Sequence, residues 1–271
     1  MTQTQTFQPT FLQKLLGRNY KWWYVVLYDI LASTNYRLST FFVVIRDLIP
    51  VFISLTIYGS FLESREFIEY FLLGNLFFKI VLLFADINWE IRHAIAYGTI
   101  SKYLIRPTNW LKYEFFSCIG GNLFSVTINV LIFVFLIMVN SVYINFSLIN
   151  ILQLLLSLII AIVIYFCIDV IVGAVTFWTP ETNVLIDTKL ILTPLLAGAL
   201  VFLSTNSITK SFVYLPWSFL VHHPMQIYLG KYNSTETFYV FLGGVIWCVI
   251  LYFLAKFVFK MGLKRNESVG L

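Results

Sequence analysis

Charged side chains interrupt the hydrophobic stretches of this chain at Arg46, Asp47, Lys79, Asp169, Asp187 and Lys189. A charge inside hydrocarbon is costly, so such residues often mark a substrate path, a proton relay or a pair between helices. All of them fall toward the side of the membrane that we predict to be cytosolic. One interpretation is a polar inner vestibule, which suits an amphiphilic or hydrophobic cargo better than a continuous ion pore. The other is snorkelling and helix–helix pairing, for example of Asp47 with Lys79.

Motifs for other chemistry are absent from the sequence. It contains no G-x-x-x-x-G-K-[ST] loop for nucleotide phosphates, no H-E-x-x-H and no G-x-S-x-G. His222 and His223 are adjacent, and neighbouring residues of a helix point in different directions, so a metal site there is not expected. The three cysteines form no C-x-x-C pair and are interpreted as small hydrophobic packing residues. We therefore predict no catalytic residue, no metal site and no cofactor on this chain.

The elements that carry these charges are hydrophobic blocks long enough to cross a membrane. Of the 271 residues, 59% are hydrophobic and only 11% are charged, and the mean hydropathy is +0.85. A soluble domain has about 25% charged residues, so a soluble enzyme is excluded. The blocks are about 20 residues long, as transmembrane helices require. We predict an all-α membrane protein with six transmembrane helices, over 41–62, 67–87, 118–139, 149–176, 184–204 and 237–259.

The flanking segments complete a single transmembrane domain over residues 1–271. Residues 11–38 contain a short apolar run with Trp22 and Trp23, which predicts an N-terminal helix lying along the interface. The six-helix bundle covers 41–259, and 260–271 form a tail. Lys and Arg gather in the segments that lie inside if both termini are cytosolic, which sets the orientation. The net charge of +5 then indicates contact with membrane lipid and not with nucleic acid.

Two loops are predicted to be more than connectors. Residues 89–105 form one helix, or two hinged at Gly98, that ends before Pro107. Its apolar and charged side chains could form a docking surface made of Trp89, Glu90, Ile91, Arg92, His93, Ile95 and Gly98. The alternative is a helix that lies on the lipid. On the outer side, 219–229 is too short to cross, which predicts a re-entrant or interfacial piece.

The order of these elements resembles that of ABC-2-type permeases, the membrane subunits of bacterial ABC exporters. Residues 98–107 read Gly-x-Ile-x-x-x-Leu-x-Arg-Pro, and 262–268 read Gly-Leu-Lys-Arg-Asn-Glu-Ser, with Asn266 where the family has an aromatic residue. The resemblance implies two ABC ATPase subunits that hold ATP and Mg²⁺ and a second permease chain, identical or homologous. It also implies that 89–105 contains the coupling helix that docks on an ATPase. Export by alternating access through the bacterial inner membrane would follow.

Two other functions remain open at this point. One is an ion-coupled secondary carrier that uses intramembrane carboxylates such as Asp169 for proton coupling. The other is a non-transport membrane scaffold or enzyme partner. A stoichiometric ATPase partner is expected only for the permease.

Overall fold

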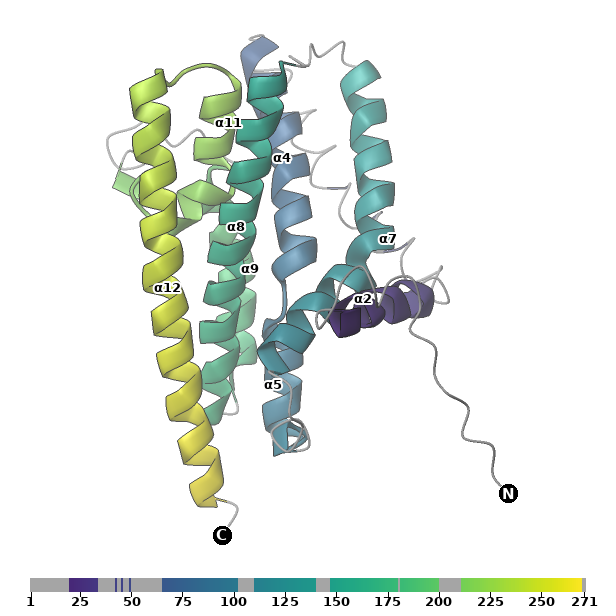
Figure 1. The fold of residues 1–271 in the computed structure, drawn as a ribbon, viewed down its shortest axis with the longest axis vertical. Coiled ribbons are helices and arrows are strands. Elements are labelled where there is room, and N and C mark those ends of the chain that lie inside the picture. Colours follow the sequence, from purple (N-terminus) through teal and green to yellow (C-terminus); the bar gives the residue numbers. More distant parts are fainter. Residues whose placement is uncertain are drawn as a thin grey trace.

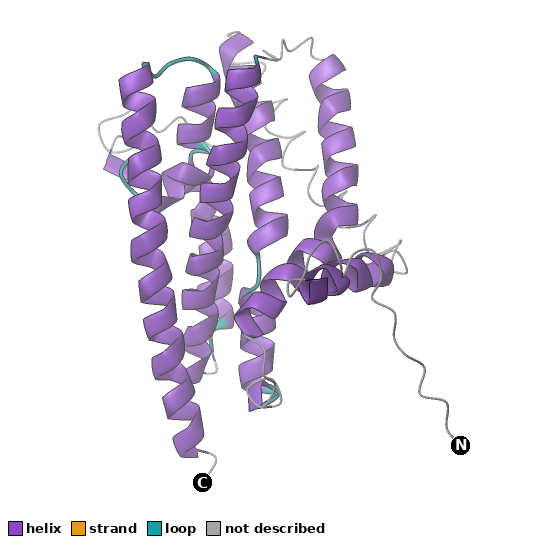
Figure 2. Ribbon diagram, in the orientation of Figure 1, coloured by secondary structure: helices purple, strands orange, loops and turns teal. Residues whose placement is uncertain are grey.

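The computed structural model describes residues 20–33, 42, 45, 49, 65–101, 110–139, 147–179, 181–199 and 211–269. The elements are α2 (Tyr20–Ser33), α4 (Arg65–Ala85), α5 (Asn88–Ala96), α7 (Trp110–Val139), α8 (Leu148–Ala174), the 3₁₀ turn η3 (Val175–Phe177), α9 (Asn183–Ala197), the 3₁₀ turn η4 (Pro216–Leu220), α11 (His222–Tyr228) and α12 (Ser234–Val269). Every regular element in this part of the chain is helical (Figure 2). The predicted all-α architecture is therefore confirmed for the described residues.

Within those residues, four helical segments are long and apolar enough to cross a membrane. They are Ile68–Ala96, Trp110–Leu136, Leu148–Phe177 and Ser234–Arg265. They contain or overlap four of the predicted spans, and α7 begins earlier and α12 ends later than predicted. The predicted span 41–62 lies outside the described residues, apart from three isolated positions. The total of six spans and the cytosolic termini thus stay predictions.

The fifth predicted span, 184–204, is described only as far as residue 199. Its helix α9 ends at Ala197 because Gly198 takes the left-handed conformation, with φ 80°. The amide N–H groups of Gly198 and Ala199 then bond back to the carbonyls of Leu195 and Pro194, as at many helix C-termini. Gly198 therefore ends this helix.

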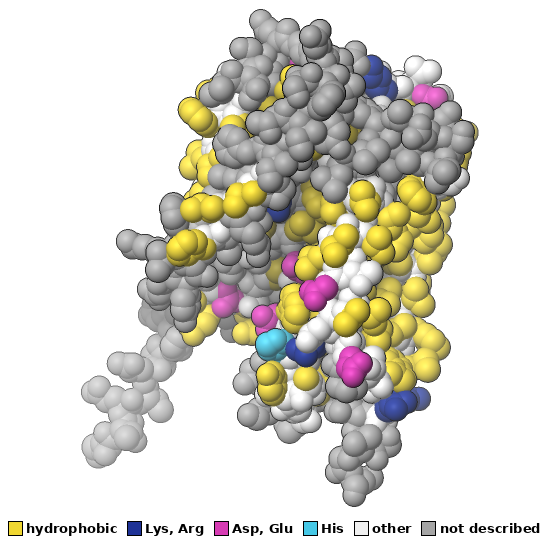
Figure 3. All heavy atoms as spheres, turned by 180° about the vertical axis from the view of Figure 1, so that it is seen from behind, with side chains coloured by type: hydrophobic (Ala, Val, Ile, Leu, Met, Phe, Trp, Pro, Cys, Tyr) yellow, Lys and Arg dark blue, Asp and Glu magenta, His cyan; other side chains and the backbone are white. Residues whose placement is uncertain are grey.

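Helix α8 is the central element of the bundle, with α4 and α12 running along it (Figure 1). Its first half exposes Leu148, Leu152 and Leu155, while its second half is buried. Large hydrophobic side chains are also exposed along α12. In the view of Figure 3 hydrophobic side chains cover much of one side of the molecule, and most of the charged side chains in view lie in its lower half, with a few others at the upper edge. Such an apolar girdle is what lipid contact requires.

Helix α2 lies across the bundle axis and packs against α7 (Figure 1). The Trp22 and Phe116 rings stack with their centroids 5.4 Å apart. A Cβ at Gly120 would stand 2.5 Å from the Val26 carbonyl oxygen, so only glycine permits this close crossing. The orientation is the one that an interfacial helix within 11–38 would take.

The segment η4–α11 is buried inside the bundle against α8 and α4. His223 Nε2 lies 3.0 Å from the Val213 carbonyl oxygen, and Nδ1 lies 3.0 Å from the Tyr232 hydroxyl. The Val213 carbonyl can only accept, so Nε2–H of His223 donates to it, and Nδ1 of the neutral ring accepts from the Tyr232 hydroxyl. Burial, with a smaller contribution from the Glu236 charge, raises the pKa of Tyr232 to about 12, so this hydroxyl stays protonated. The histidine is thus a satisfied structural residue.

Candidate functional site

Asp169 is a carboxylate on α8, which is the most hydrophobic of the four candidate spans among the described residues. It lies in the second half of α8 and has no solvent exposure. Its Oδ1 atom is 2.6 Å from Lys189 Nζ on α9, and Lys189 is also buried. A buried charge is tolerated when it is paired and hydrogen-bonded, so this contact fixes α9 against α8.

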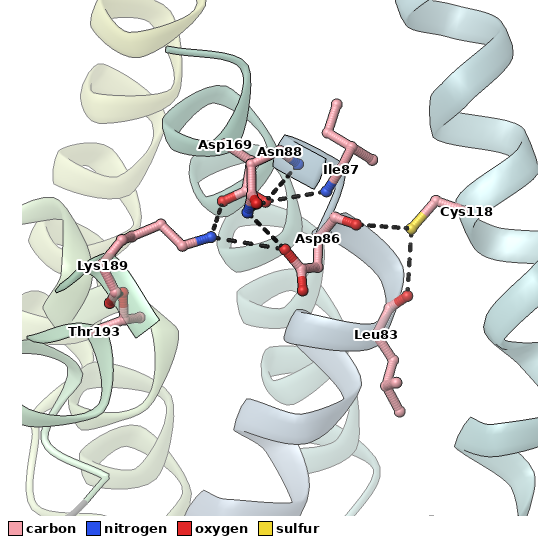
Figure 4. A network of polar contacts seen from close by, with 8 residues as sticks. All are labelled: Leu83, Asp86, Ile87, Asn88, Cys118, Asp169, Lys189 and Thr193. Atoms are coloured by element: carbon pink, nitrogen blue, oxygen red, sulfur yellow. Dashed lines mark hydrogen bonds and ion pairs between the residues drawn. The ribbon is translucent and has the colours of Figure 1, made fainter. Parts of the chain in front are cut away.

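The second carboxylate oxygen of Asp169 caps helix α5 (Figure 4). Oδ2 accepts hydrogen bonds from the amide N–H groups of Ile87 and Asn88, at 3.0 and 3.3 Å, and from Asn88 Nδ2 at 2.7 Å. Ile87 stands at the N-cap position, and no side chain of α5 itself makes a capping bond. A carboxylate there satisfies free amide groups and interacts favourably with the helix dipole. The cap of α5 is therefore supplied by another helix.

Asp86 links the same cluster to the end of α4. Its Oδ1 accepts a hydrogen bond from Asn88 Nδ2 at 2.7 Å and lies 3.7 Å from Lys189 Nζ. Lys189 also lies over the Tyr165 ring, 4.6 Å from its centroid. One lysine thus stands between two carboxylates, and the amide groups of α5 supply the remaining favourable interactions. We call Asp86, Asn88, Asp169 and Lys189 the junction cluster.

A close backbone approach holds α5 onto α8 one turn beyond Asp169. A Cβ at Gly173 would lie 2.9 Å from Ile91 Cβ and 3.1 Å from the Asn88 carbonyl oxygen. Residues four apart on a helix share a face, so Asp169 and Gly173 together form the surface of α8 on which α5 packs. Asp169 binds the N-terminus of α5, and Gly173 leaves room for the fully buried Ile91.

The outward side of α5 carries most of the other predicted docking residues. Glu90 and His93 are exposed, Trp89 and Arg92 are partly exposed, and Ile95 packs partly against the core. The Arg92 guanidinium lies 5.7 Å from the Trp89 ring centroid. Ile91, predicted as a docking residue, instead faces α8 and is buried.

The helix ends at Ala96, and Gly98 has φ 67°. Ile100 and Ser101 are helical again, as the hinged alternative predicted. The rest of the predicted helix up to 105 lies outside the described residues.

Of the remaining predicted charges, the two that the structure describes, Asp187 and Lys79, are not part of the junction cluster. Asp187 is exposed on α9, and Lys79 is half-buried on α4. Arg46 and Asp47 lie outside the described residues, so the pairing of Asp47 with Lys79 stays a prediction. Asp86 and Asn88 were not predicted, although two polar residues at the boundary of a span and a loop are a usable signal.

Comparison with known protein families identifies the kind of protein that contains the junction cluster. A family model described as "ABC-2 family transporter protein" matches residues 57–270, which include α4 through α12. This chain belongs to the ABC-2 transporter family. No curated protein and no solved structure matches it. Members of the family are membrane transport subunits that are generally non-catalytic and generally work with ABC ATPase subunits. The chain is a multi-pass membrane protein of this permease type.

Proposed function

We propose that this chain is the permease subunit of an ATP-driven exporter in a bacterial inner membrane. It works with two ATPase subunits, which bind ATP and Mg²⁺, and with a second permease chain, identical or homologous. Its six spans, with both termini in the cytosol, alternate between inward and outward access. The inner charges and the apolar outer half suit an amphiphilic or hydrophobic cargo.

The observation that carries the proposal is the attachment of α5. This short helix lies at the same end of the bundle as the C-terminal end of α12 (Figure 1), and its N-terminus is bound to Asp169 on α8. Lys189 extends the same contact to α9. A push on the outward face of α5 is thereby passed to two bundle helices through charged contacts. We assign α5 as the coupling helix, with Trp89, Glu90, Arg92 and His93 facing the ATPase.

The proton-carrier alternative is disfavoured by the contacts of Asp169. Its two oxygens accept hydrogen bonds from Lys189 Nζ, from two backbone amide N–H groups and from the Asn88 side chain. Protonating this carboxylate would weaken the cap of α5 and remove the charge that pairs with Lys189. A group held in this way is suited to fastening helices and not to loading and releasing protons.

The test is the double variant Trp89→Ala with Arg92→Glu, which removes the aromatic anchor and reverses a charge on the outward face of α5. We expect normal membrane insertion, with reduced ATPase copurification or ATP hydrolysis uncoupled from export. A matched control is Lys231→Glu, an exposed charge reversal in the loop between α11 and α12. Normal copurification and normal export by the double variant would refute the coupling role of α5.

A further inference from the structure

A cavity of about 800 Å³ opens between α7, α8 and α12. Its lining residues come from the first two turns of α7, the second half of α8 and the second half of α12. Its walls are mostly apolar and include Phe115, Val163, Phe166 and Ala255. Small-molecule sites range from about 300 to 1,000 Å³, so the cavity can hold a sizeable part of an amphiphile.

Aromatic pairs define two sides of the cavity. Trp110 on α7 meets Phe259 on α12 with ring centroids 5.8 Å apart, and Phe115 on α7 meets Phe166 on α8 at 5.0 Å, edge to face. The Trp110 indole N–H donates to Glu114 at 2.6 Å, so its polar atom is satisfied within α7. The cavity therefore has a packed apolar wall that connects three helices.

The charged residues that line the cavity are all basic. They are Lys112 in the first turn of α7 and Lys256 and Lys260 on α12, and all three are exposed. Lys256 and Lys260 are four residues apart, which places them on one face of the helix. No acidic residue is among the described residues that line the space. The site thus joins an apolar interior to a positively charged rim.

We propose that this cavity binds an anionic phospholipid from the membrane leaflet on the side of α5. Its acyl chains lie against the apolar wall and its headgroup phosphate lies near Lys112, Lys256 and Lys260. Basic pockets between transmembrane helices are suited to anionic headgroups, and the surrounding bilayer supplies the ligand at high local concentration. The inference does not depend on the direction of transport, on the cargo or on the ATPase.

The experiment titrates phosphatidylglycerol and phosphatidylcholine into the purified full-length permease and counts bound lipids by native mass spectrometry. We expect the wild type to retain phosphatidylglycerol preferentially. The variant Lys256→Gln with Lys260→Gln should bind it about 30-fold more weakly, from about 5-fold for each lysine at an anionic surface. The control Lys21→Gln with Lys231→Gln removes the same charge from exposed positions outside the cavity lining and should bind as the wild type does.

A second variant distinguishes lipid binding inside the cavity from lipid binding to a charged surface. Val163→Phe fills the apolar interior and leaves all three lysines in place, so it should also lose phosphatidylglycerol. Equal binding by Val163→Phe and the wild type would overturn the proposal, as would equal retention of the two lipids or an equal effect of the control pair. A disulfide-linked dimer formed by Tyr252→Cys would show that a second copy covers the cavity, which also contradicts it.

Discussion

The contribution of Lys189 to stability can be tested by removing its charge, which leaves two buried or partly buried carboxylates without their cation. Lys189→Met keeps most of the side-chain volume but removes the only cation within the junction cluster. Asp169 would stay fully buried, and Asp86 would stay near it through Asn88. Asp169→Asn is the milder change, because Lys189 keeps Asp86 at 3.7 Å and the asparagine oxygen can still accept from α5.

The magnitudes follow from these contacts. Removing one partner of a buried pair costs about 3–5 kcal/mol, which we expect for Lys189→Met. Asp169→Asn weakens the cap and its charged hydrogen bonds, at a cost of about 1–2 kcal/mol. The double variant leaves no unpaired charge at these two positions, so it should be more stable than Lys189→Met alone. The second substitution thus acts as a rescue, because a coupling energy of about 3 kcal/mol between the two residues outweighs the cost of Asp169→Asn itself.

Thermal unfolding in detergent, followed by size-exclusion fluorescence, measures the effect. For a chain of this size about 2–4 °C corresponds to 1 kcal/mol, so Lys189→Met should lower the midpoint by roughly 6–20 °C. The double variant should recover about 1–2 kcal/mol of that loss, or roughly 2–8 °C of the midpoint. Wild-type stability of Lys189→Met, or a double variant that loses the sum of the single losses, would refute the buried pair.

Two further predictions concern α5 and the topology. Gly173→Ala should cost about 1–3 kcal/mol and weaken ATPase coupling, because its Cβ would press on Ile91. Gly121→Ala, with open space at its Cβ, is the control. Equal melting midpoints for the two variants would contradict the close packing of α5 on α8. In intact cells Ser101→Cys should react only with membrane-permeant thiol reagents and Ser207→Cys with impermeant ones as well, so labelling of Ser101→Cys from outside would reverse the orientation.

Several features of this protein could be read from local sequence alone. Hydropathy blocks of membrane-spanning length predicted the helices that became α4, α7, α8 and α12, because a backbone in hydrocarbon must satisfy its own hydrogen bonds. A hinge at Gly98 was one of the two predicted alternatives for 89–105, and its positive φ is a conformation that glycine adopts at little cost. The family resemblance rested on short motifs and on the order of elements, and both are properties of the linear chain.

Tertiary structure decided which charges meet. Asp169 lies 82 positions from Ile87 and 20 from Lys189, and nothing in the spacing of these residues indicates their contact. The sequence marked Asp169 as a costly intramembrane charge but allowed either a proton relay or a helix pair. Only the packing of α5 on α8 brings free amide groups to its second oxygen, and Gly173 permits that approach. A charge in an apolar helix is visible locally, whereas its partner depends on which helices pack together.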